Sequence, residues 1–356
     1  MGAYIVKKLG YSLLTLWGVA TVVFLLFTLL PGDPARMMLG QNETAEQVAM
    51  VKRKYGFDQP LSVQYLRYLN DLAPISFHST HADDYTFFGE KYSGIKLFEG
   101  ESVIIALKFP HLRESFQKNG KQVSLVITET LPNTIVLATS AILIAMFLGI
   151  FLGIISAMFK DRILDKIIQL VSTLGMSVPS FFSAILFAWI FGFLLHRYTH
   201  LDMTGSLYEV DDFGTRKFIR WKNLILPAVV LGIRPLAVVT QLMRNSLLEV
   251  LEQDYIRTAR AKGLSFWKII RRHALKNALN PVVTAISGWF ASMLAGAVFV
   301  EYIFGWNGLG KEIVDALNTL DLPVIMGAVL TIATTFIVIN ILVDIIYGWL
   351  DPKISL

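Results

Sequence analysis

Long apolar stretches alternate with short polar segments along most of the 356-residue chain. A bilayer core about 30 Å thick needs about 20 apolar residues in a helix, and six stretches reach that length. The predicted spans are Leu9–Gly32, Pro132–Phe159, Ile167–Leu195, Leu224–Met243, Leu279–Val300 and Leu322–Val343. Only the fourth contains a charged residue, Arg234. The pattern therefore predicts an all-α polytopic membrane protein with six transmembrane helices.

The Lys and Arg residues of the connecting segments predict its orientation. Six spans place both termini on one side of the membrane, and the short segments on that side hold 14 Lys and Arg against six on the other. Cytoplasmic loops carry such an excess, and long segments are left out of the comparison because they cross largely regardless of charge. We therefore expect a multi-pass protein of the cytoplasmic (inner) membrane with both termini in the cytoplasm.

Polar residues dominate one long segment, 33–131, which follows the first span and is predicted to be extracytoplasmic. Thr44-Ala-Glu-Gln47 matches a capping box and predicts a helix that ends before Gly56. Pro60 opens a second amphipathic stretch, Leu61–Leu72.

The rest of this segment has a weaker pattern. Residues 76–102 show no periodicity and receive no predicted structure, whereas Ser115–Leu131 is consistent with an amphipathic lead-in to the second span. Covering a channel mouth and contacting substrate are both compatible with the insert at 76–120. The predicted organisation is an N-terminal cytoplasmic end with the first helix (1–32), an extracytoplasmic segment (33–131), a core domain (132–350) with a loop at 252–281, and a cytoplasmic C-terminus (351–356).

Composition agrees with a membrane protein. Hydrophobic residues make up 54% of the chain and charged residues 17%, compared with about a quarter charged in an average soluble domain. The chain contains no cysteine, which excludes disulfides, Fe–S clusters and thiol nucleophiles. The net charge of +5 is explained by basic cytoplasmic loops, so we expect contact with membrane lipid and no nucleic-acid partner.

The stretch GWNGLGKE at residues 305–312 resembles a phosphate-binding P-loop, G-x-x-x-x-G-K-[ST]. Glu312, however, stands where a hydroxyl should bind magnesium, and the predicted topology places the stretch outside the cytoplasm. The glycines are better explained by a sharp turn as the chain leaves the membrane. Any ATP that drives this protein is therefore expected to be bound by another chain.

The segment 252–281 is basic, with a helical pattern that Gly263 interrupts. Arg257-Thr258-Ala259, three further residues and Gly263 resemble the EAA loop, E-A-A-x-x-x-G, of importer permeases of the ATP-binding-cassette (ABC) superfamily. Arg257 and Thr258 replace the Glu and the first Ala of that consensus. The continuation RHALKNALNP, in which His273 and Lys276 replace Ile and Pro, is similar to the peptide/nickel branch.

Other short sequence motifs support the same resemblance, and they occur along the chain in the order typical of this family. They are LLPGDPA (29–35), LPNT (131–134), SVPS (177–180), EYIF (301–304) followed by GLG (308–310), and LDPK (350–353). The resemblance implies a type I importer fold and a B-type permease subunit for dipeptides or oligopeptides, without catalytic residues of its own. Nickel or metal-chelate uptake is an alternative within the same family.

The resemblance also implies partners. They are a second homologous permease, two ABC ATPase subunits that bind ATP and Mg, and an extracytoplasmic solute-binding protein, with no cofactor in this chain. The EAA-like loop is expected to dock as a coupling helix on an ATPase. The residues expected to make this contact are Thr258, Ala259, Gly263, Leu264 and Ser265, flanked by Arg257, Arg260 and Lys262.

Arg234 is the one ionisable residue well inside a predicted span, about 12 Å along the helix. Charged residues at that depth mark a transport pathway or a buried partner. Contact with a peptide and a purely structural role are both open. A secondary transporter would need more such residues for ion coupling, and a membrane-embedded enzyme would need converging catalytic groups that the spans lack.

His196 and His200 are four residues apart, with Asp202 nearby, so a helix would present both imidazoles on one face. No HExxH motif accompanies them, and Arg197 and Tyr198 suit the aromatic and basic belt at the end of a span. No metal site is expected.

Overall fold

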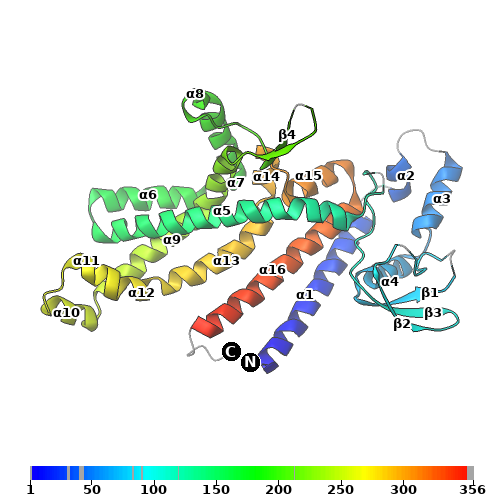
Figure 1. Cartoon of the computed structure of the whole chain (residues 1–356), viewed down its shortest axis with the longest axis horizontal. Coiled ribbons are helices and arrows are strands. Elements are labelled where there is room, and N and C mark those ends of the chain that lie inside the picture. Colours follow the sequence, from blue (N-terminus) through cyan, green and yellow to red (C-terminus); the bar gives the residue numbers. More distant parts are fainter. Residues whose placement is uncertain are drawn as a thin grey trace. The chain divides into compact units, whose positions relative to one another are not determined.

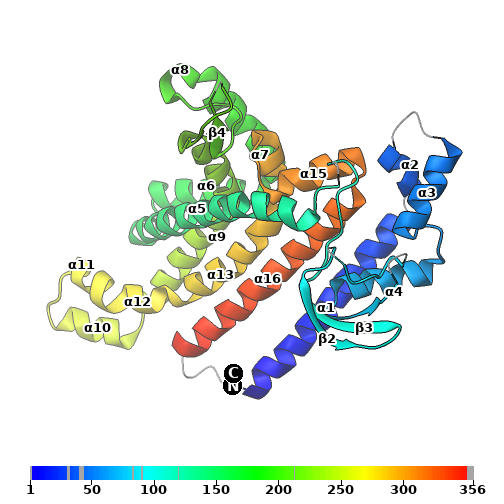
Figure 2. The same ribbon diagram turned by 45° about the vertical axis from the view of Figure 1, so that its right-hand side comes forward.

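The computed structural model describes residues 2–29, 33–39, 44–81, 84–89, 91–118, 120–211 and 213–350. The predicted C-terminus at 351–356 and the end of the first predicted span at 30–32 lie outside these residues. Figures 1 and 2 show a mostly helical chain. It divides into unit 1, Met1–Glu129 with Glu312–Thr334, and unit 2, Thr130–Lys311 with Thr335–Leu356.

The α-helices are α1 (Gly2–Leu29), α2 (Pro34–Leu39), α3 (Ala45–Tyr55), α4 (Leu61–Leu72), α5 (Val123–Met158), α6 (Ile163–Ser177), α7 (Ser180–Phe187), α8 (His196–Thr199), α9 (Lys222–Leu251), α10 (Asp254–Ala261), α11 (Phe266–Ile269), α12 (Leu275–Ala278), α13 (Asn280–Gly296), α14 (Val298–Phe304), α15 (Leu309–Thr319) and α16 (Leu322–Leu350). Two π-helical segments are η1 (Ala188–Leu194) and η2 (Ile270–Ala274). The strands are β1 (Ile75–Ser79), β2 (Gly94–Glu99), β3 (Val103–Lys108), β4 (Tyr208–Val210) and β5 (Lys217–Ile219).

Four helices of the described chain are long and apolar enough to cross a membrane: α1, α5, α9 and α16. Two bent pairs, α6 with α7–η1 and α13 with α14, raise the number to as many as six if each pair is one span. The third predicted span, Ile167–Leu195, corresponds to a bent helix pair, in which the chain turns by 109° between α6 and α7. Val178 is extended and Pro179 precedes α7, as expected because proline disfavours helical geometry at the residue before it.

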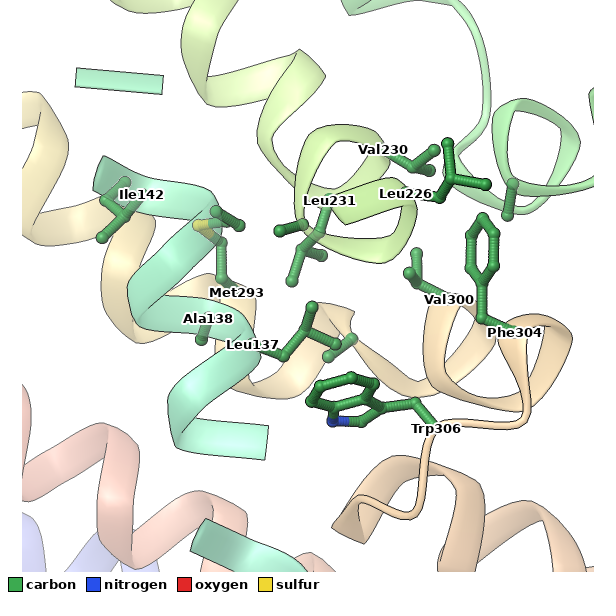
Figure 3. Close-up of a cluster of buried hydrophobic side chains, with 14 of the residues drawn as sticks. Leu137, Ala138, Ile142, Leu226, Val230, Leu231, Met293, Val300, Phe304 and Trp306 are labelled. Carbon is green, nitrogen blue, oxygen red and sulfur yellow. The ribbon is translucent and has the colours of Figure 1, made fainter. Parts of the chain in front are cut away.

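The core of unit 2 lies where α5, α9, α13 and α14 meet (Figure 3). Leu137 and Trp306 are fully buried there, and Phe304 is almost so. The indole Nε1 of Trp306 donates to the backbone oxygen of Asn133 at 3.0 Å, so this buried ring leaves no unsatisfied polar group. Helix α5 approaches α9 closely, and a Cβ at Gly153 would lie 2.6 Å from the Cβ of Met243. Small residues at such contacts are typical of packed membrane helices.

Helices α3 and α4 of unit 1 agree with the prediction from the sequence. Thr44 and Gln47 form the capping box of α3, and Gly56 ends that helix in the left-handed region. Helix α4 covers the predicted range Leu61–Leu72.

The stretch without periodicity, 76–102, contains β2 and most of β1, which join β3 in a three-stranded antiparallel sheet in the order β1-β3-β2. Phe77 of β1 pairs with Ile105 of β3, which pairs in turn with Phe98 of β2. A second, two-stranded sheet joins β4 and β5 in unit 2. The all-α prediction is therefore corrected to a mostly helical fold, and the expected lead-in helix starts only at Val123.

A buried carboxylate ties α4 to the chain that follows β3. Asp71 is fully buried and accepts hydrogen bonds from Tyr85 Oη (3.1 Å), Tyr92 Oη (2.9 Å) and Arg113 Nε (3.0 Å). Arg113 has φ of 66°, a backbone conformation that is costly for a residue with a side chain. The ion pair with Asp71 helps to hold it there.

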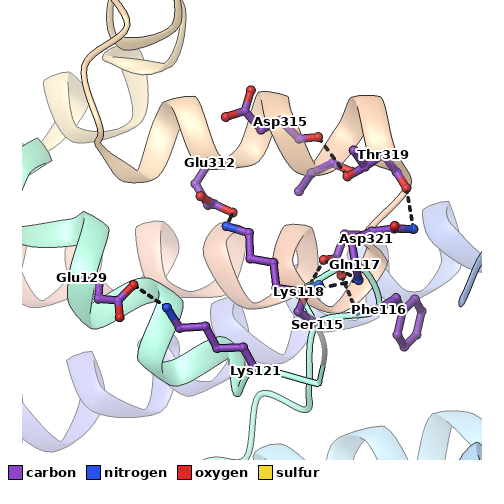
Figure 4. A network of polar contacts seen from close by, with 11 residues as sticks. Ser115, Phe116, Gln117, Lys118, Lys121, Glu129, Glu312, Asp315, Thr319 and Asp321 are labelled. Carbon is purple, nitrogen blue, oxygen red and sulfur yellow. Dashed lines mark hydrogen bonds and ion pairs between the residues drawn. The ribbon is translucent and has the colours of Figure 1, made fainter. Parts of the chain in front are cut away.

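A second polar network joins the segment before α5 to the turn between α15 and α16 (Figure 4). The carboxylate of Asp321 accepts from Ser115 Oγ and from the backbone amide of Phe116 (3.0 Å). Lys118 pairs with Glu312, the residue that breaks the P-loop match. Glu312 thus has a structural partner within unit 1.

Candidate functional site

The loop after α9 contains two short helices separated by a sharp turn. Helix α10 ends at Ala261, and Gly263 has φ of +74° before Ser265 starts α11. Only glycine adopts this geometry without strain, so the predicted break at Gly263 is confirmed. Figure 1 shows α10, α11 and α12 beyond the C-terminal end of α9, while α8 and β4 lie at the other end.

The inner side of this loop is apolar and packs on α9. Ile256, Ala259 and Ile269 are buried in one cluster with Met243 and Leu247 of α9. Such close packing fixes the position of the loop on the end of the helix.

The outer side of the loop carries the predicted coupling residues. Six of the eight are exposed, Leu264 is half-buried and Ala259 is buried; the exposed ones are Arg257, Thr258, Arg260, Lys262, Gly263 and Ser265. Arg257 lies 3.3 Å from Asp254, and both side chains remain mostly in solvent. The structure therefore brings the predicted residues together. Six of them form an exposed, mainly basic surface, and the other two, Ala259 and Leu264, belong to the apolar side that packs on α9.

Aromatic side chains on the same surface escaped the sequence analysis. Trp267 is 64% exposed beside Phe266, and Tyr255 is 42% exposed. Tyr255 Oη accepts from Asn277 Nδ2 at 2.8 Å, which links α10 to α12. Aromatic residues exposed next to basic ones are typical of protein-binding surfaces. The sequence did contain a signal for this surface, because a tryptophan, Trp267, stands within the basic segment 252–281.

An ion pair joins the helix ends beside this loop. Arg244 of α9 donates from Nε to Asp165 Oδ1 (2.8 Å) and from Nη2 to Oδ2 (2.6 Å). Asp165 also accepts from Ser156 Oγ and from the backbone amide of Asp161. Its side chain is only 3% exposed and that of Arg244 18%. Helices α5, α6 and α9 therefore converge on one carboxylate, a connection between residues 79 positions apart that no local pattern indicates.

Arg234 lies where α6 breaks. Its Nε is 3.4 Å from the backbone oxygen of Met176 in the last turn of α6. The side chain is exposed and lines a cavity of about 100 Å³ together with Ser180, Ser183 and Trp289. Among the described residues no carboxylate forms an ion pair with Arg234. A guanidinium at this position can bind a carboxylate.

The glycine-rich stretch GWNGLGKE surrounds a carboxylate of the chain itself. Glu301 is fully buried, and its Oε2 accepts from the backbone amides of Gly310 (2.7 Å) and Lys311 (3.1 Å) in the first turn of α15. A Cβ at Gly308 would lie 2.4 Å from the Glu301 carboxylate. The glycines allow a carboxyl group of the chain itself to approach the helix N-terminus, where a P-loop would bind a phosphate.

Sequence comparison then decides the family. A model of the family described as "Binding-protein-dependent transport system inner membrane component" matches residues 149–356, more than half of the chain, and a model of its N-terminal region matches residues 1–94. The chain belongs to this family. It is accordingly a membrane-embedded transport component, and the match includes the exposed basic loop, the Asp165–Arg244 pair and the Glu301 turn.

Several curated members of the family are similar over their full length. The dipeptide transport system permease protein DppB of Alkalihalophilus pseudofirmus is 33% identical over 368 residues, covering 100% of both chains. The di/tripeptide transport system permease protein DppB of Pseudomonas aeruginosa is 33% identical, covering 99% of each chain. The glutathione transport system permease protein GsiC of Salmonella paratyphi A is 33% identical over 351 residues, covering 99% of this chain and 98% of that one.

Solved structures give a weaker likeness. Two inward-facing crystal forms of the MetNI methionine ABC transporter match with TM-scores of 0.48 and 0.49, at 15% and 16% identity. They cover 63% and 62% of this chain and 95% and 94% of the matched chains. Because both TM-scores are below 0.5, membership of the inner membrane component family rests on the sequence matches.

Proposed function

We propose that this chain is the transmembrane permease subunit of an ATP-driven importer that passes di- or oligopeptides across the cytoplasmic membrane. The observation that carries the proposal is the loop after α9, which is rigidly seated on a membrane helix and presents a basic, aromatic surface to solvent. Membership of the transport family and the names of the full-length relatives support peptides as the cargo.

In this proposal the chain has six spans, with each bent pair counted as one, and a type I importer fold. Both termini and the loop 252–281 are cytoplasmic, whereas 33–131 is extracytoplasmic. The excess of Lys and Arg in the short segments on the loop's side supports this orientation.

The loop couples the permease to ATP hydrolysis on two separate ATPase subunits, which hold ATP and Mg. Thr258, Gly263 and Ser265 allow close backbone approach, and Arg257, Arg260 and Lys262 can pair with acidic side chains of the ATPase. Buried Ala259 and half-buried Leu264 act indirectly, by fixing the loop on α9. ATP-driven closure of the ATPases then shifts the permease between inward-open and outward-open states.

A second homologous permease completes the pore, and an extracytoplasmic solute-binding protein delivers the peptide. Arg234 contributes to the pathway: its guanidinium, which donates from Nε to the carbonyl of Met176, binds the peptide carboxylate. The 109° turn after α6 supports this role, since broken membrane helices expose such groups.

The coupling role is tested in proteoliposomes that contain the chain with its co-expressed partner subunits. We expect Arg260→Glu/Lys262→Glu to leave the purified permease folded, to weaken ATPase association and to lower ATP-driven uptake of a labelled dipeptide at least tenfold. The matched control is Arg197→Glu, an exposed charge reversal at the other end of the membrane helices. Undiminished uptake by the double variant, or uptake without the ATPases, would contradict the proposal.

The pathway role of Arg234 is tested separately. Arg234→Gln should assemble normally and retain ATPase association but lose most peptide uptake, and Arg234→Lys should retain part of it because the charge remains. If Arg234→Gln transports peptide as fast as the parent chain, Arg234 has no part in the pathway.

A further inference from the structure

Strands β1 and β3 of the three-stranded sheet in unit 1 have one covered and one bare face, whereas β2 is exposed along its whole length. On β1 and β3 the residues of the covered face are 5% exposed or less; they are Ser76, His78, Ile104, Ala106 and Lys108. The alternate residues are large, apolar and mostly 44–70% exposed; they include Ile75, Phe77, Ile95, Phe98, Val103 and Leu107. The bare face is therefore the hydrophobic one, the reverse of a sheet in a water-facing domain.

The strand register makes this face continuous. Ile75, Leu107 and Ile95 form one row across the three strands. Phe77, Ile105 and Phe98 form the next. Contiguous apolar patches of this kind mark a surface that contacts something other than water.

Helix α4 is held at a defined position along α1. Tyr65 Oη of α4 is hydrogen-bonded to Thr21 Oγ1 of α1 at 2.6 Å, and the ring of Phe24 stacks on Tyr68 with centroids 5.6 Å apart. The apolar window of α1 is Lys7–Leu26, so Thr21 lies five residues inside its C-terminal end. At 1.5 Å per residue this is about 7.5 Å below the end of the apolar window. Helix α4 therefore contacts α1 at the level of lipid acyl chains.

The same helix carries the sheet. Asn70 of α4 donates from Nδ2 to the backbone oxygen of Phe77 and accepts from its amide, both at 2.8 Å. These bonds satisfy backbone groups on the free edge of β1, and unpaired sheet edges are not tolerated in hydrocarbon. The sheet is thus attached to a helix that already lies at membrane depth, by its edge strand β1.

We propose that the bare face of the β1-β3-β2 sheet is a membrane-contact surface that lies on lipid, in the leaflet at the C-terminal end of α1. Lipid is the occupant because α4, to which the sheet is attached, contacts α1 at Thr21, inside the apolar window of that helix. Phe and aliphatic side chains on one face, with the polar groups on the other, match an element that lies in the headgroup–acyl boundary. The contact would hold the segment between α1 and α5 against the membrane surface.

The cysteine-free sequence makes a clean test possible. Phe98→Cys and, separately, Ile95→Cys would be introduced into the full chain with its partner subunits, labelled with a nitroxide and placed in nanodiscs of phosphatidylcholine and phosphatidylglycerol. Leu14→Cys, 60% exposed within the apolar window of α1, is the lipid reference. Asp58→Cys, exposed between α3 and α4, is the water reference.

We expect both sheet labels to match the lipid reference, with a ratio of oxygen to nickel-chelate collision rates several-fold above that of Asp58. A nickel-chelate accessibility equal to that of Asp58 would overturn the proposal, because the face would then be in water. Protection from both reagents would also overturn it, because the face would then be covered by protein. Both substituted residues are 61–70% exposed, so folding should be unaffected.

Discussion

The carboxylate of Glu301 accepts a hydrogen bond of 2.7 Å from the backbone amide of Gly310. This contact places a carboxyl group at the N-terminus of α15, where its oxygen accepts from backbone amides that have no partner within the helix. Gly310 has no space for a side chain, since a Cβ would lie 2.5 Å from the Cα of Val298.

A methyl group at Gly308 or Gly310 should therefore destabilise the protein. We expect Gly308→Ala and Gly310→Ala to lower the free energy of unfolding by about 1–3 kcal/mol through overpacking. Gly288→Ala is the matched control, because a Cβ at this position would meet nothing within 4 Å and the substitution favours helix. The measurement is the thermal unfolding midpoint of the detergent-solubilised chain. Equal midpoints for all three variants would show that Glu301 does not depend on these glycines.

Loss of the Arg244 guanidinium should leave a buried charge. Arg244→Met removes both hydrogen bonds to Asp165, whose side chain is 3% exposed, and should cost about 3 kcal/mol of stability. Asp165→Asn added to Arg244→Met should recover part of the loss, because the uncompensated charge disappears. Arg271→Met, at an exposed position, serves as control in the same unfolding measurement. A double variant no more stable than Arg244→Met would argue against a charge effect.

Trp267 should matter for association and not for folding. Trp267→Ala removes a side chain that is 64% exposed, so the stability of the isolated chain should change by less than about 0.5 kcal/mol. If Trp267 is an anchor of the ATPase interface, the variant should bind the ATPase subunits with at least about 2 kcal/mol less free energy. Trp221→Ala, 61% exposed at the start of α9, should leave that affinity unchanged. Affinity can be measured by titrating labelled ATPase onto permease in nanodiscs.

Acid should weaken the fold around β3. Burial lowers the pKa of His111 to about 4, against an ordinary value of 6.5, in the neighbourhood of Asp71, Lys91, Lys108 and Arg113. Between these values the unfolded state binds the proton and the folded state does not, so the free energy of unfolding falls as pH drops from 6.5 towards 4. Above pH 6.5 this contribution is constant.

Hydrogen exchange of β3 amides in the full chain, corrected for intrinsic rates, measures this effect. His111→Gln should reduce the loss of protection between pH 6.5 and 4. The pKa of His78 is also lowered by burial, so some pH dependence should remain. Identical profiles for the parent and His111→Gln would exclude His111 as a source.

Local signals in the sequence were enough for features that depend on nearby residues. The capping box at Thr44, the stop at Gly56 and the break at Gly263 each depend on contacts within a few positions, and all three are confirmed. The apolar lengths likewise indicated where helices could cross a membrane.

Features that depend on distant residues were missed or misjudged. The sheet at 75–108 has no clear alternation because its bare face is apolar and its covered face includes Ala and Ile as well as Ser, His and Lys. The Asp165–Arg244 pair and the contact of Asp321 with Ser115 join residues 79 and 206 positions apart. Pro179 lies within the third apolar stretch, but the size of the 109° turn depends on how α7 packs with α9 and α14, which no local pattern indicates.

The apolar contact between α9 and the loop that follows it determines how a force on the loop would be transmitted. Ile256, Ala259 and Ile269 fill the space against Met243 and Leu247, and densely packed side chains are barely compressible. A force applied at Lys262 would therefore be passed on to α9, because the side chains packed between the loop and the helix cannot be compressed. A shift of the loop would therefore move α9 with it, in the direction of Arg234.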